Sequence, residues 1–207
     1  MQTDVLPNFN TCRVLVLGDV MLDRYLMGEV KRISPEAPVP VLRVKERYEV
    51  LGGAGNVANN LAKLGCRTLL LGVVGVDPDG ESVRKLCEQL AIDSHLITDP
   101  QRPTITKTRV IAREQQLLRL DEEETDTLGN TAREELLARF EEELPTCQSV
   151  IFSDYGKGIF QTPDFCQLLL ALAKEQSIPV FVDPKGRDWD RYRGATCITP
   201  NVQELEL

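Results

Sequence analysis

The feature that most constrains the fold is the alternation of short, continuous apolar runs with amphipathic helical segments. Three of the runs, at 13–18 (RVLVLG), 68–74 (TLLLGVV) and 149–153 (SVIFS), have the length and composition of buried strands. Segment 51–64 instead spaces its apolar residues for one face of a helix, at Ala54, Val57, Ala58, Leu61 and Ala62. Strands that are apolar on both faces and joined by helices indicate a parallel sheet with helices on both sides. The sequence therefore predicts an α/β fold in which helices cover both faces of a parallel sheet.

The same alternation of apolar runs and amphipathic helices continues along the chain, except in two stretches. Further helices are expected at 80–91, 131–144 and 162–175, and further strands at 179–183 and 196–199. The stretches 39–50 and 104–121 instead alternate apolar with charged residues, which is typical of half-exposed antiparallel strands. We expect these two stretches to form a small β lid beside the parallel sheet. Because no repeat or linker interrupts the chain, we expect residues 1–207 to form a single domain.

Composition excludes several classes of function. The 207 residues carry 24 Lys and Arg against 32 Asp and Glu, a net charge of −8, which leaves no basic surface for a nucleic-acid backbone. The apolar runs are too short to span a bilayer, and residues 1–10 do not resemble a signal peptide. The six cysteines form no C-x-x-C pair, which argues against zinc and favours thiols in a reducing compartment. Since His95 is the only histidine, Ser-His-Asp, Cys-His and histidine-rich metal chemistry would all depend on that residue.

Polar residues and glycines gather where the predicted strands end. Asp19 and Asp23 follow the first strand, 153–158 (SDYGKG) follows another, and 183–187 (DPKGR) a third. Ligands of open α/β sheets bind at the carboxyl ends of the strands, so these groups converge on one candidate site. The run 52–56 (GGAGN) enters a helix, whose first N–H groups and positive dipole suit an anion or a hydroxyl. Taken alone, each feature also fits a tight turn or a cap, and the acidic run 122–126 fits a solvated loop.

Several motifs, in order along the chain, resemble those of one family. The run 52–58 (GGAGNVA), followed by Gly65 and Gly75, is similar to the N-terminal signature of the ribokinase-like (PfkB) carbohydrate kinases. Seven further segments resemble the kinase domain of the D-glycero-β-D-manno-heptose 7-phosphate kinases: 18–25 (GDVMLDRY), 32–40 (RISPEAPVP), 103–109 (PTITKTR), 115–121 (QQLLRLD), 153–158, 183–187 and 191–201 (RYRGATCITPN). The resemblance implies a ribokinase-like, Rossmann-type α/β sandwich with a β lid, in agreement with the pattern of strands and helices.

The resemblance also implies an activity. Kinases of this kind transfer a phosphoryl group from ATP, with Mg²⁺, to the C1 hydroxyl of heptose 7-phosphate, giving the 1,7-bisphosphate. The reaction serves ADP-heptose and lipopolysaccharide core synthesis, and many relatives carry a C-terminal adenylyltransferase domain. We expect a cytoplasmic enzyme, a homodimer or higher homo-oligomer, whose partners are a sugar phosphate and ATP. The net charge and the short apolar runs exclude nucleic acid and membrane from these partners.

Roles for individual residues follow from their positions in the motifs. The family's sugar-binding groups correspond to Asp19, Asp23, Gly53 and Asn56. Segment 199–204 (TPNVQE) resembles the N-x-x-E element that organises the nucleotide phosphates and Mg²⁺, and Glu204 is the expected metal ligand. The remaining members of that nucleotide group are Asn201, Val202 and Gln203. The cations Lys107, Arg109, Lys157 and Lys185 are candidates for the 7-phosphate or the ATP phosphates; Lys185 is grouped with the nucleotide, and the others, with Asp154, with the sugar.

One motif of the family is missing. The motif D-x-x-G-A-G-D does not occur in the 207 residues. In the family, the backbone of this motif forms an anion hole, and its last Asp takes the proton of the attacking hydroxyl. We interpret the chain, which stops within a helix expected from Asn201, as a truncated kinase domain that is inactive alone. Two alternatives stay open: a kinase of another sugar or sugar phosphate, and a non-catalytic sugar-phosphate-binding or self-associating module. A dinucleotide-binding protein is disfavoured, because G-x-G-x-x-G does not follow the first strand.

Overall fold

Residues 8–206 are described by a computed structural model, in which the chain forms a six-stranded parallel sheet and a four-stranded second sheet. The larger sheet has the strand order β10-β9-β8-β1-β4-β5. Its strands are β1 (Arg13–Gly18), β4 (Arg67–Gly75), β5 (Asp93–Asp99), β8 (Ser149–Ser153), β9 (Val180–Asp183) and β10 (Cys197–Ile198). Residues 1–7, part of the segment tested for a signal peptide, and residue 207 lie outside the described residues.

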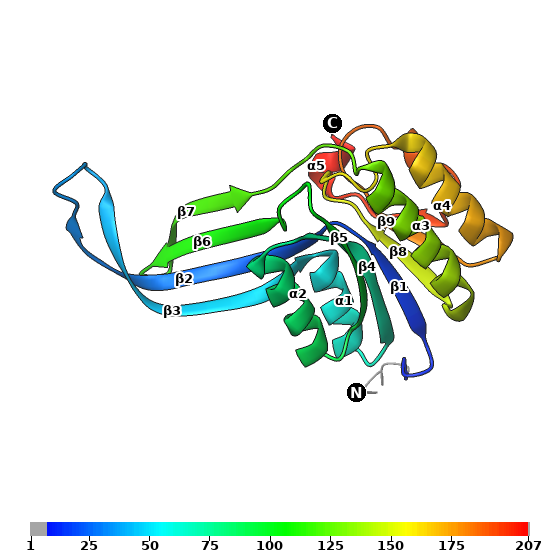
Figure 1. Ribbon diagram of the computed structural model, residues 1–207, viewed down its shortest axis with the longest axis horizontal. Helices are drawn as coiled ribbons and strands as arrows, with labels where there is room; N and C mark the ends of the chain where they lie inside the picture. The colour runs from blue at the N-terminus through cyan, green and yellow to red at the C-terminus, as the bar shows by residue number, and fades with distance from the viewer. Residues whose placement is uncertain (1–7, 207) are drawn as a thin grey trace, which may run out of the picture.

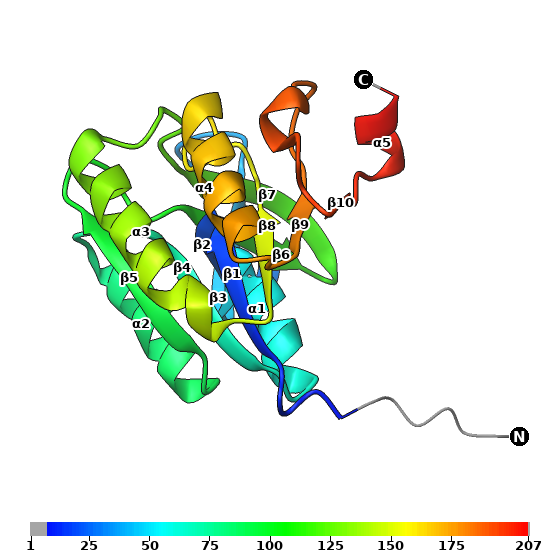
Figure 2. The same ribbon diagram turned by 90° about the vertical axis from the view of Figure 1, so that its right-hand side faces the viewer.

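Helices cover both faces of the parallel sheet, as Figures 1 and 2 show. One face carries α1 (Ala54–Lys63) and α2 (Pro78–Gln89), and the other carries α3 (Asn130–Glu143) and α4 (Pro163–Glu175). Side chains of β1 alternate between the two cores: Leu15 and Leu17 belong to the core of α3 and α4, and Val16 to that of α1 and α2. Because both faces of β1 are buried, its sequence is a continuous apolar run. The predicted α/β sandwich is confirmed.

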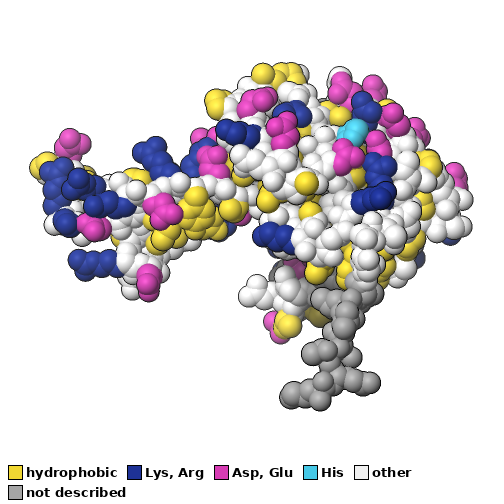
Figure 3. Space-filling model, turned by 90° about the horizontal axis from the view of Figure 1, so that it is seen from below, with side chains coloured by type: hydrophobic (Ala, Val, Ile, Leu, Met, Phe, Trp, Pro, Cys, Tyr) yellow, Lys and Arg dark blue, Asp and Glu magenta, His cyan; other side chains and the backbone are white. Residues whose placement is uncertain are grey.

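The second sheet is a lid that projects from the carboxyl edge of the parallel sheet (Figure 1). It has the order β3-β2-β6-β7, with β2 (Val20–Ile33), β3 (Pro40–Gly53), β6 (Thr106–Ala112) and β7 (Gln115–Glu122). The pairs β2–β3 and β6–β7 are antiparallel, and β2 joins them through parallel pairing with β6. The β2–β3 hairpin extends beyond β6 and β7, and Lys and Arg side chains cluster at its far end (Figures 1 and 3).

The lid is larger than the sequence suggested. Strands lie in both stretches expected for it, but 104–121 is divided by a tight turn in which Arg113 and Glu114 have φ of 48° and 65°. β2 was not expected, because most of it is half-exposed and its apolar and charged residues do not alternate cleanly. β5 was not expected either, because its sequence DSHLITD is neither a continuous apolar run nor a clean alternation. Asp23, which was expected to follow the first strand, therefore lies inside a lid strand, and the alternative of a turn or cap residue is wrong for it.

The chain passes between sandwich and lid at four places: β1 to β2, β3 to α1, β5 to β6, and β7 to α3. The last part of the described chain adds three short helices, η1 (Leu144–Thr146), η2 (Asp190–Tyr192) and α5 (Val202–Leu205). Three of the cysteines, Cys87, Cys147 and Cys166, are buried, whereas Cys197 is exposed. Within 8–206, none of the helices has both the length and the apolar character needed to cross a membrane.

Candidate functional site

The carboxyl ends of three neighbouring strands are aligned. Gly18 of β1 pairs with Ser153 of β8, which pairs with Asp183 of β9. The residues that follow, Asp19 and Asp154, therefore emerge side by side at one edge of the sheet. The backbone supports this arrangement, since Asp19 N–H donates to Ser153 O at 3.2 Å and Asp154 N–H to Asp183 O at 3.0 Å. The structure thus brings together the strand ends that the sequence singled out.

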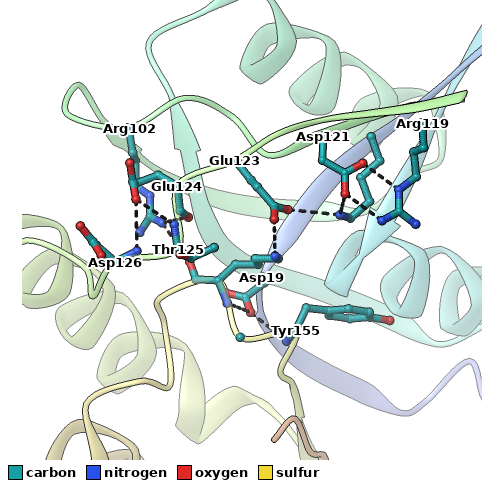
Figure 4. Close-up of polar contacts among 12 residues, drawn as sticks. Asp19, Arg102, Arg119, Asp121, Glu123, Glu124, Thr125, Asp126 and Tyr155 are labelled. Carbon is teal, nitrogen blue, oxygen red and sulfur yellow. Dashed lines mark hydrogen bonds and ion pairs between the residues drawn. The ribbon is translucent and has the colours of Figure 1, made fainter.

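Asp19 is almost completely buried, with 2% of its surface exposed. Its Oδ2 accepts hydrogen bonds from the backbone N–H groups of Tyr155 (2.8 Å) and Lys157 (3.0 Å), as Figure 4 shows for Tyr155. Its Oδ1 is buried without a hydrogen-bond partner in the described chain. Burial, followed by the negative charge of Asp154, raises the pKa of Asp19 to about 6. Asp19 therefore fixes the loop 154–158 through its hydrogen bonds to the loop backbone.

Asp154 is also buried and binds protein groups with both oxygens. Its Oδ1 accepts from Gly156 N–H at 2.6 Å, and its Oδ2 accepts from the hydroxyl of Tyr192. The guanidinium of Arg191 lies 3.6 Å from the same Oδ2. Burial raises the pKa of Tyr192, so its hydroxyl stays a donor. In this arrangement Asp154 fixes the loop against η2, and its side chain is 1% exposed.

The lid presents a polar face towards the strand ends. Across the sheet, Asp23 of β2 is in register with Lys107 of β6, and Lys107 with Asp121 of β7. Asp23 also accepts a hydrogen bond from Arg109 at 2.7 Å, and the Arg109 guanidinium lies 5.2 Å from the centre of the Tyr25 ring. Partial burial lowers the pKa of Arg109, but the bond to Asp23 more than offsets this and the net pKa is raised. Asp23, Lys107 and Arg109 therefore share one face.

A chain of ion pairs connects this lid face with the loop after β8 (Figure 4). Glu123, just after β7, binds Lys157 of the loop through Oε1 at 2.6 Å and Lys107 through Oε2 at 3.2 Å. Lys107 also binds Asp121 at 3.0 Å, and Asp121 binds Arg119 at 2.8 Å. Partial burial acts to raise the pKa of Glu123, but the two lysines outweigh it and lower the pKa below its usual value. The expectation of a solvated loop at 122–126 is wrong for Glu123.

The start of α1 faces the same edge. Gly53, its N-cap, has φ of 54°, and a Cβ there would lie 2.2 Å from Asp19 O, so only glycine fits. No side chain caps this helix, and Ala54 N–H donates to Asp19 O at 3.0 Å. Asn56, in the first turn, is exposed. The remaining first-turn N–H groups and the helix dipole therefore suit an oxygen-rich ligand.

The expected nucleotide-binding residues lie at the start of α5. Asn201 and Glu204 form a capping box: Glu204 N–H donates to Asn201 Oδ1 and Asn201 N–H to Glu204 Oε2, both at 2.9 Å. Glu204 Oε1 binds Lys185 Nζ at 3.2 Å. Val202 and Gln203 are exposed. In the described residues, no group of three His, Cys, Asp or Glu side chains could hold a metal ion. Because both Glu204 oxygens are engaged, the residues present do not by themselves form a magnesium site.

Sequence reasoning missed three residues that organise this region. Glu123 lay in an acidic run whose pattern gave no sign of lysine partners. Arg102, which donates to Glu124 O at 2.6 Å and Lys157 O at 2.9 Å, precedes a motif but is not part of it. Tyr192 lies within the segment 191–201, which was noted only for its resemblance. Their partners are distant in sequence, so local patterns could not identify them.

A groove of about 830 Å³ lies elsewhere in the described part of the chain. It is lined by Arg24, Leu26 and Leu120 of the lid together with Lys85 and Leu86 of α2. Arg24 and Leu26 alternate with Asp23 and Tyr25 along β2, so the groove is on the opposite face of the lid. It contains none of the groups that converge at the strand ends.

The sequence of the chain is similar to those of known proteins. Residues 12–207 match the profile described as pfkB family carbohydrate kinase. The chain is 47% identical over 200 residues to the bifunctional protein HldE of Actinobacillus pleuropneumoniae serotype 5b (strain L20), a match covering 97% of this chain and 41% of the relative. It is 48% identical over 198 residues to HldE of Haemophilus influenzae (strain PittEE), covering 96% and 40%. The chain thus spans about two-fifths of the length of these relatives.

Solved structures share the fold at lower identity. A possible 1-phosphofructokinase from Thermotoga maritima superposes with a TM-score of 0.72 at 21% identity, covering 92% of this chain and 61% of the other. The tetrameric inhibited form of phosphofructokinase-2 from Escherichia coli gives a TM-score of 0.69 at 21% identity, covering 94% and 63%. At this identity the two structures support the fold alone.

Proposed function

The chain belongs to the pfkB family of carbohydrate kinases, and we propose that it is the sugar-binding part of a kinase that phosphorylates D-glycero-β-D-manno-heptose 7-phosphate at C1. The observation that carries the proposal is the polar lid face, where Asp23 and Arg109 lie beside Lys107 opposite the loop 154–158. A carboxylate can accept hydrogen bonds from sugar hydroxyls, and nearby cations can bind a phosphoryl group. The similarity to HldE proteins over 97% of the chain supports the choice of a heptose.

Each residue has a part in this proposal. Asp23, Asn56 and the backbone at Gly53 bind sugar hydroxyls, while Lys107, Arg109 and Lys157 bind the 7-phosphate. Asp19 and Asp154 act indirectly, because both are buried and hold the loop that carries Lys157. ATP would be the phosphoryl donor, approached by Lys185 and the segment Asn201 to Glu204. The family's chemistry is an in-line phosphoryl transfer, which depends on positioning and charge stabilisation.

The 207 residues by themselves are proposed to bind the sugar phosphate without turning over ATP. They contain no D-x-x-G-A-G-D segment, and so neither the anion hole nor the base that it supplies. Two hypotheses therefore have to be distinguished by experiment. The chain is either a binding module without catalysis or part of a kinase that acts with further residues. We further propose that the protein acts in the cytoplasm.

Self-association is also proposed. The lid exposes large apolar side chains, among them Leu118 (53%) and Leu120 (48%), and Figure 3 shows apolar atoms gathered on the projecting arm. Exposed apolar surface of this kind is often covered by a partner. Sedimentation equilibrium over a range of concentrations would give the mass of the assembly, and a monomer throughout would contradict this proposal.

The function is tested by calorimetry with a panel of ligands. We expect the chain to bind heptose 7-phosphate more tightly than the unphosphorylated heptose, and more tightly than fructose 6-phosphate or ribose 5-phosphate. A preference for one of the other sugar phosphates would favour the alternative kinase. Absence of binding to every sugar phosphate would contradict the proposed function.

A further inference from the structure

The position of Glu123 suggests a role that the family resemblance does not supply. Its two carboxylate oxygens lie between two ammonium groups, one from the lid and one from the sandwich, at 3.2 Å from Lys107 and 2.6 Å from Lys157. Both lysine side chains are largely shielded from solvent, with 16% and 17% exposed. Ion pairs in such a setting are less screened by salt than surface pairs. Glu123 is therefore a strong internal counter-ion for both lysines.

A carboxylate placed in this way occupies the position that suits a phosphoryl group. Carboxylate and phosphoryl oxygens both accept charge-assisted hydrogen bonds from ammonium groups, and both can bridge two of them. The lowered pKa of Glu123, where the lysines outweigh the effect of partial burial, keeps the carboxylate charged at neutral pH. An incoming anion therefore meets lysines that are already neutralised.

The backbone around Glu123 is held independently of its side chain. Arg102 donates to Glu124 O at 2.6 Å and to Lys157 O at 2.9 Å, which ties the two segments together. Gly158, with φ of 118°, permits this approach, because a Cβ there would lie 2.8 Å from the Arg102 guanidinium. The Glu123 side chain can consequently leave the lysines while lid and loop stay close.

We propose that Glu123 is an internal substitute for the substrate's phosphoryl group: it occupies the anion site between Lys107 and Lys157 and is displaced when a phosphoryl anion binds. The identity of the natural ligand as a sugar phosphate rests on the proposed function, whereas the competition between Glu123 and an anion does not. Glu123 thereby selects for charged ligands. A neutral sugar cannot replace the negative charge of Glu123 between the two lysines, and so it cannot displace this side chain.

The test uses inorganic phosphate as the probe and the chain with three substitutions, studied by calorimetry at constant ionic strength. Glu123→Gln removes the competing charge and is expected to lower the Kd for phosphate at least fivefold. Glu122→Gln is the matched control, since it makes the same charge change one residue away, at a side chain with no ion pair in the described chain. It is expected to change the Kd by less than twofold. Adding Lys157→Gln to Glu123→Gln should abolish the gain.

Glu123→Asp provides a second measurement if the glutamine variant folds poorly. It keeps the charge but is too short to hold both lysines, so the Kd for phosphate should fall at least twofold. The proposal would be overturned if the Kd for phosphate were unchanged or higher in the Glu123 variants. It would also be overturned if Glu122→Gln lowered this Kd equally, or if none of the chains bound phosphate. A chain that behaves as expected with phosphate but binds no sugar phosphate would instead contradict only the proposed function.

Discussion

At the scale of single residues, the two buried aspartates at the strand ends differ in how their charge is stabilised. Asp154 has a tyrosine hydroxyl, a backbone N–H and a nearby guanidinium. Asp19 has backbone N–H groups on one oxygen and none on the other, and the charge of Asp154 is close to it. Ionised Asp19 therefore opposes folding, while it organises the loop that carries Lys157.

This difference predicts a pH dependence of stability. The pKa of Asp19 is raised from 3.8 to about 6, mainly by burial, so the folded chain binds its proton more tightly than the unfolded chain. Protonated Asp19 therefore stabilises the folded chain by about 3 kcal/mol of unfolding free energy relative to ionised Asp19. This stabilisation is fully present below about pH 4 and is lost as the pH rises through 6. Asp19→Asn cannot ionise, so its stability relative to the parent should rise by about that amount between pH 4 and 7. Urea denaturation at each pH measures the difference, and a constant difference would contradict the assignment.

A second prediction concerns Asp23. In a version of the protein that carries the catalytic motif, Asp23→Ala should raise KM for heptose 7-phosphate by about 10- to 100-fold, because a hydrogen bond to a charged group contributes roughly 1.5–3 kcal/mol. We also expect a lower kcat and an unchanged KM for ATP. Asp188→Ala, at an exposed position, is the control. A lower melting temperature with unchanged sugar kinetics would show that Asp23 serves only to hold Arg109.

At the scale of elements, the junction between β3 and α1 joins lid and sandwich in a single step. Gly53 turns the chain with φ of 54°, and its Cα faces the carbonyl of Asp19, where the chain first leaves the sandwich. The entry into β2 and the exit from β3 are thus in backbone contact, since Ala54 N–H binds Asp19 O at 3.0 Å. The glycine-rich turn and the start of α1 at the candidate site are therefore the same feature.

This contact predicts different costs for two glycine substitutions. Gly53→Ala places a Cβ 2.2 Å from a backbone oxygen and imposes a positive φ on alanine, so we expect a loss of at least ~3 kcal/mol in unfolding free energy. Gly65, after α1, also has positive φ (91°), but a Cβ there would meet nothing within 4 Å. Gly65→Ala should cost only about 1 kcal/mol. Equal losses of unfolding free energy in urea denaturation would contradict this prediction, because they would show that the backbone near Asp19 can move away from the new Cβ at little cost in free energy.

The elements also show what could be predicted from sequence. The helices and the central strands were found because periodicity and apolar runs depend on burial, which the local sequence records. β2 was missed because most of it is half-exposed lid strand, with its pairing partners at 40–53 and 106–112. The resemblance marked Asp23 and Lys107, but it could not show that Glu123 connects Lys107 to Lys157. Such contacts depend on how two distant segments are brought together.

At the scale of the whole molecule, the lid consists of two separate insertions into the sandwich. One insertion is β2–β3 and the other is β6–β7, and the parallel pairing of β2 with β6 joins them into one sheet. The candidate site lies where both insertions return to the parallel sheet, so polar groups from the lid and from the strand ends meet there. The candidate site is consequently a property of the assembled molecule and not of any single segment.

The corresponding prediction is binding without turnover. The 207-residue chain should bind heptose 7-phosphate but show no sugar-dependent ATP hydrolysis or phosphoryl transfer. General base catalysis contributes roughly 10²–10⁴-fold and each anion-hole donor roughly 10²–10³-fold, and the motif that supplies both is absent from the sequence. A coupled assay for ADP release measures this, with sugar-free reactions as the blank. Sugar-dependent turnover by the purified chain would show that other residues supply the base.

The order of strands in the parallel sheet has a consequence for synthesis on the ribosome. β1 is made first among the strands but lies in the interior of the sheet, between β4, which begins at Arg67, and β8, which begins at Ser149. At roughly 5–20 residues per second, a nascent chain needs on the order of ten seconds to extend from β1 to β8. During that interval the apolar strand β1 has an open edge, which a chaperone or a second nascent chain can reach. Slow codons between β4 and β8 would lengthen this exposure.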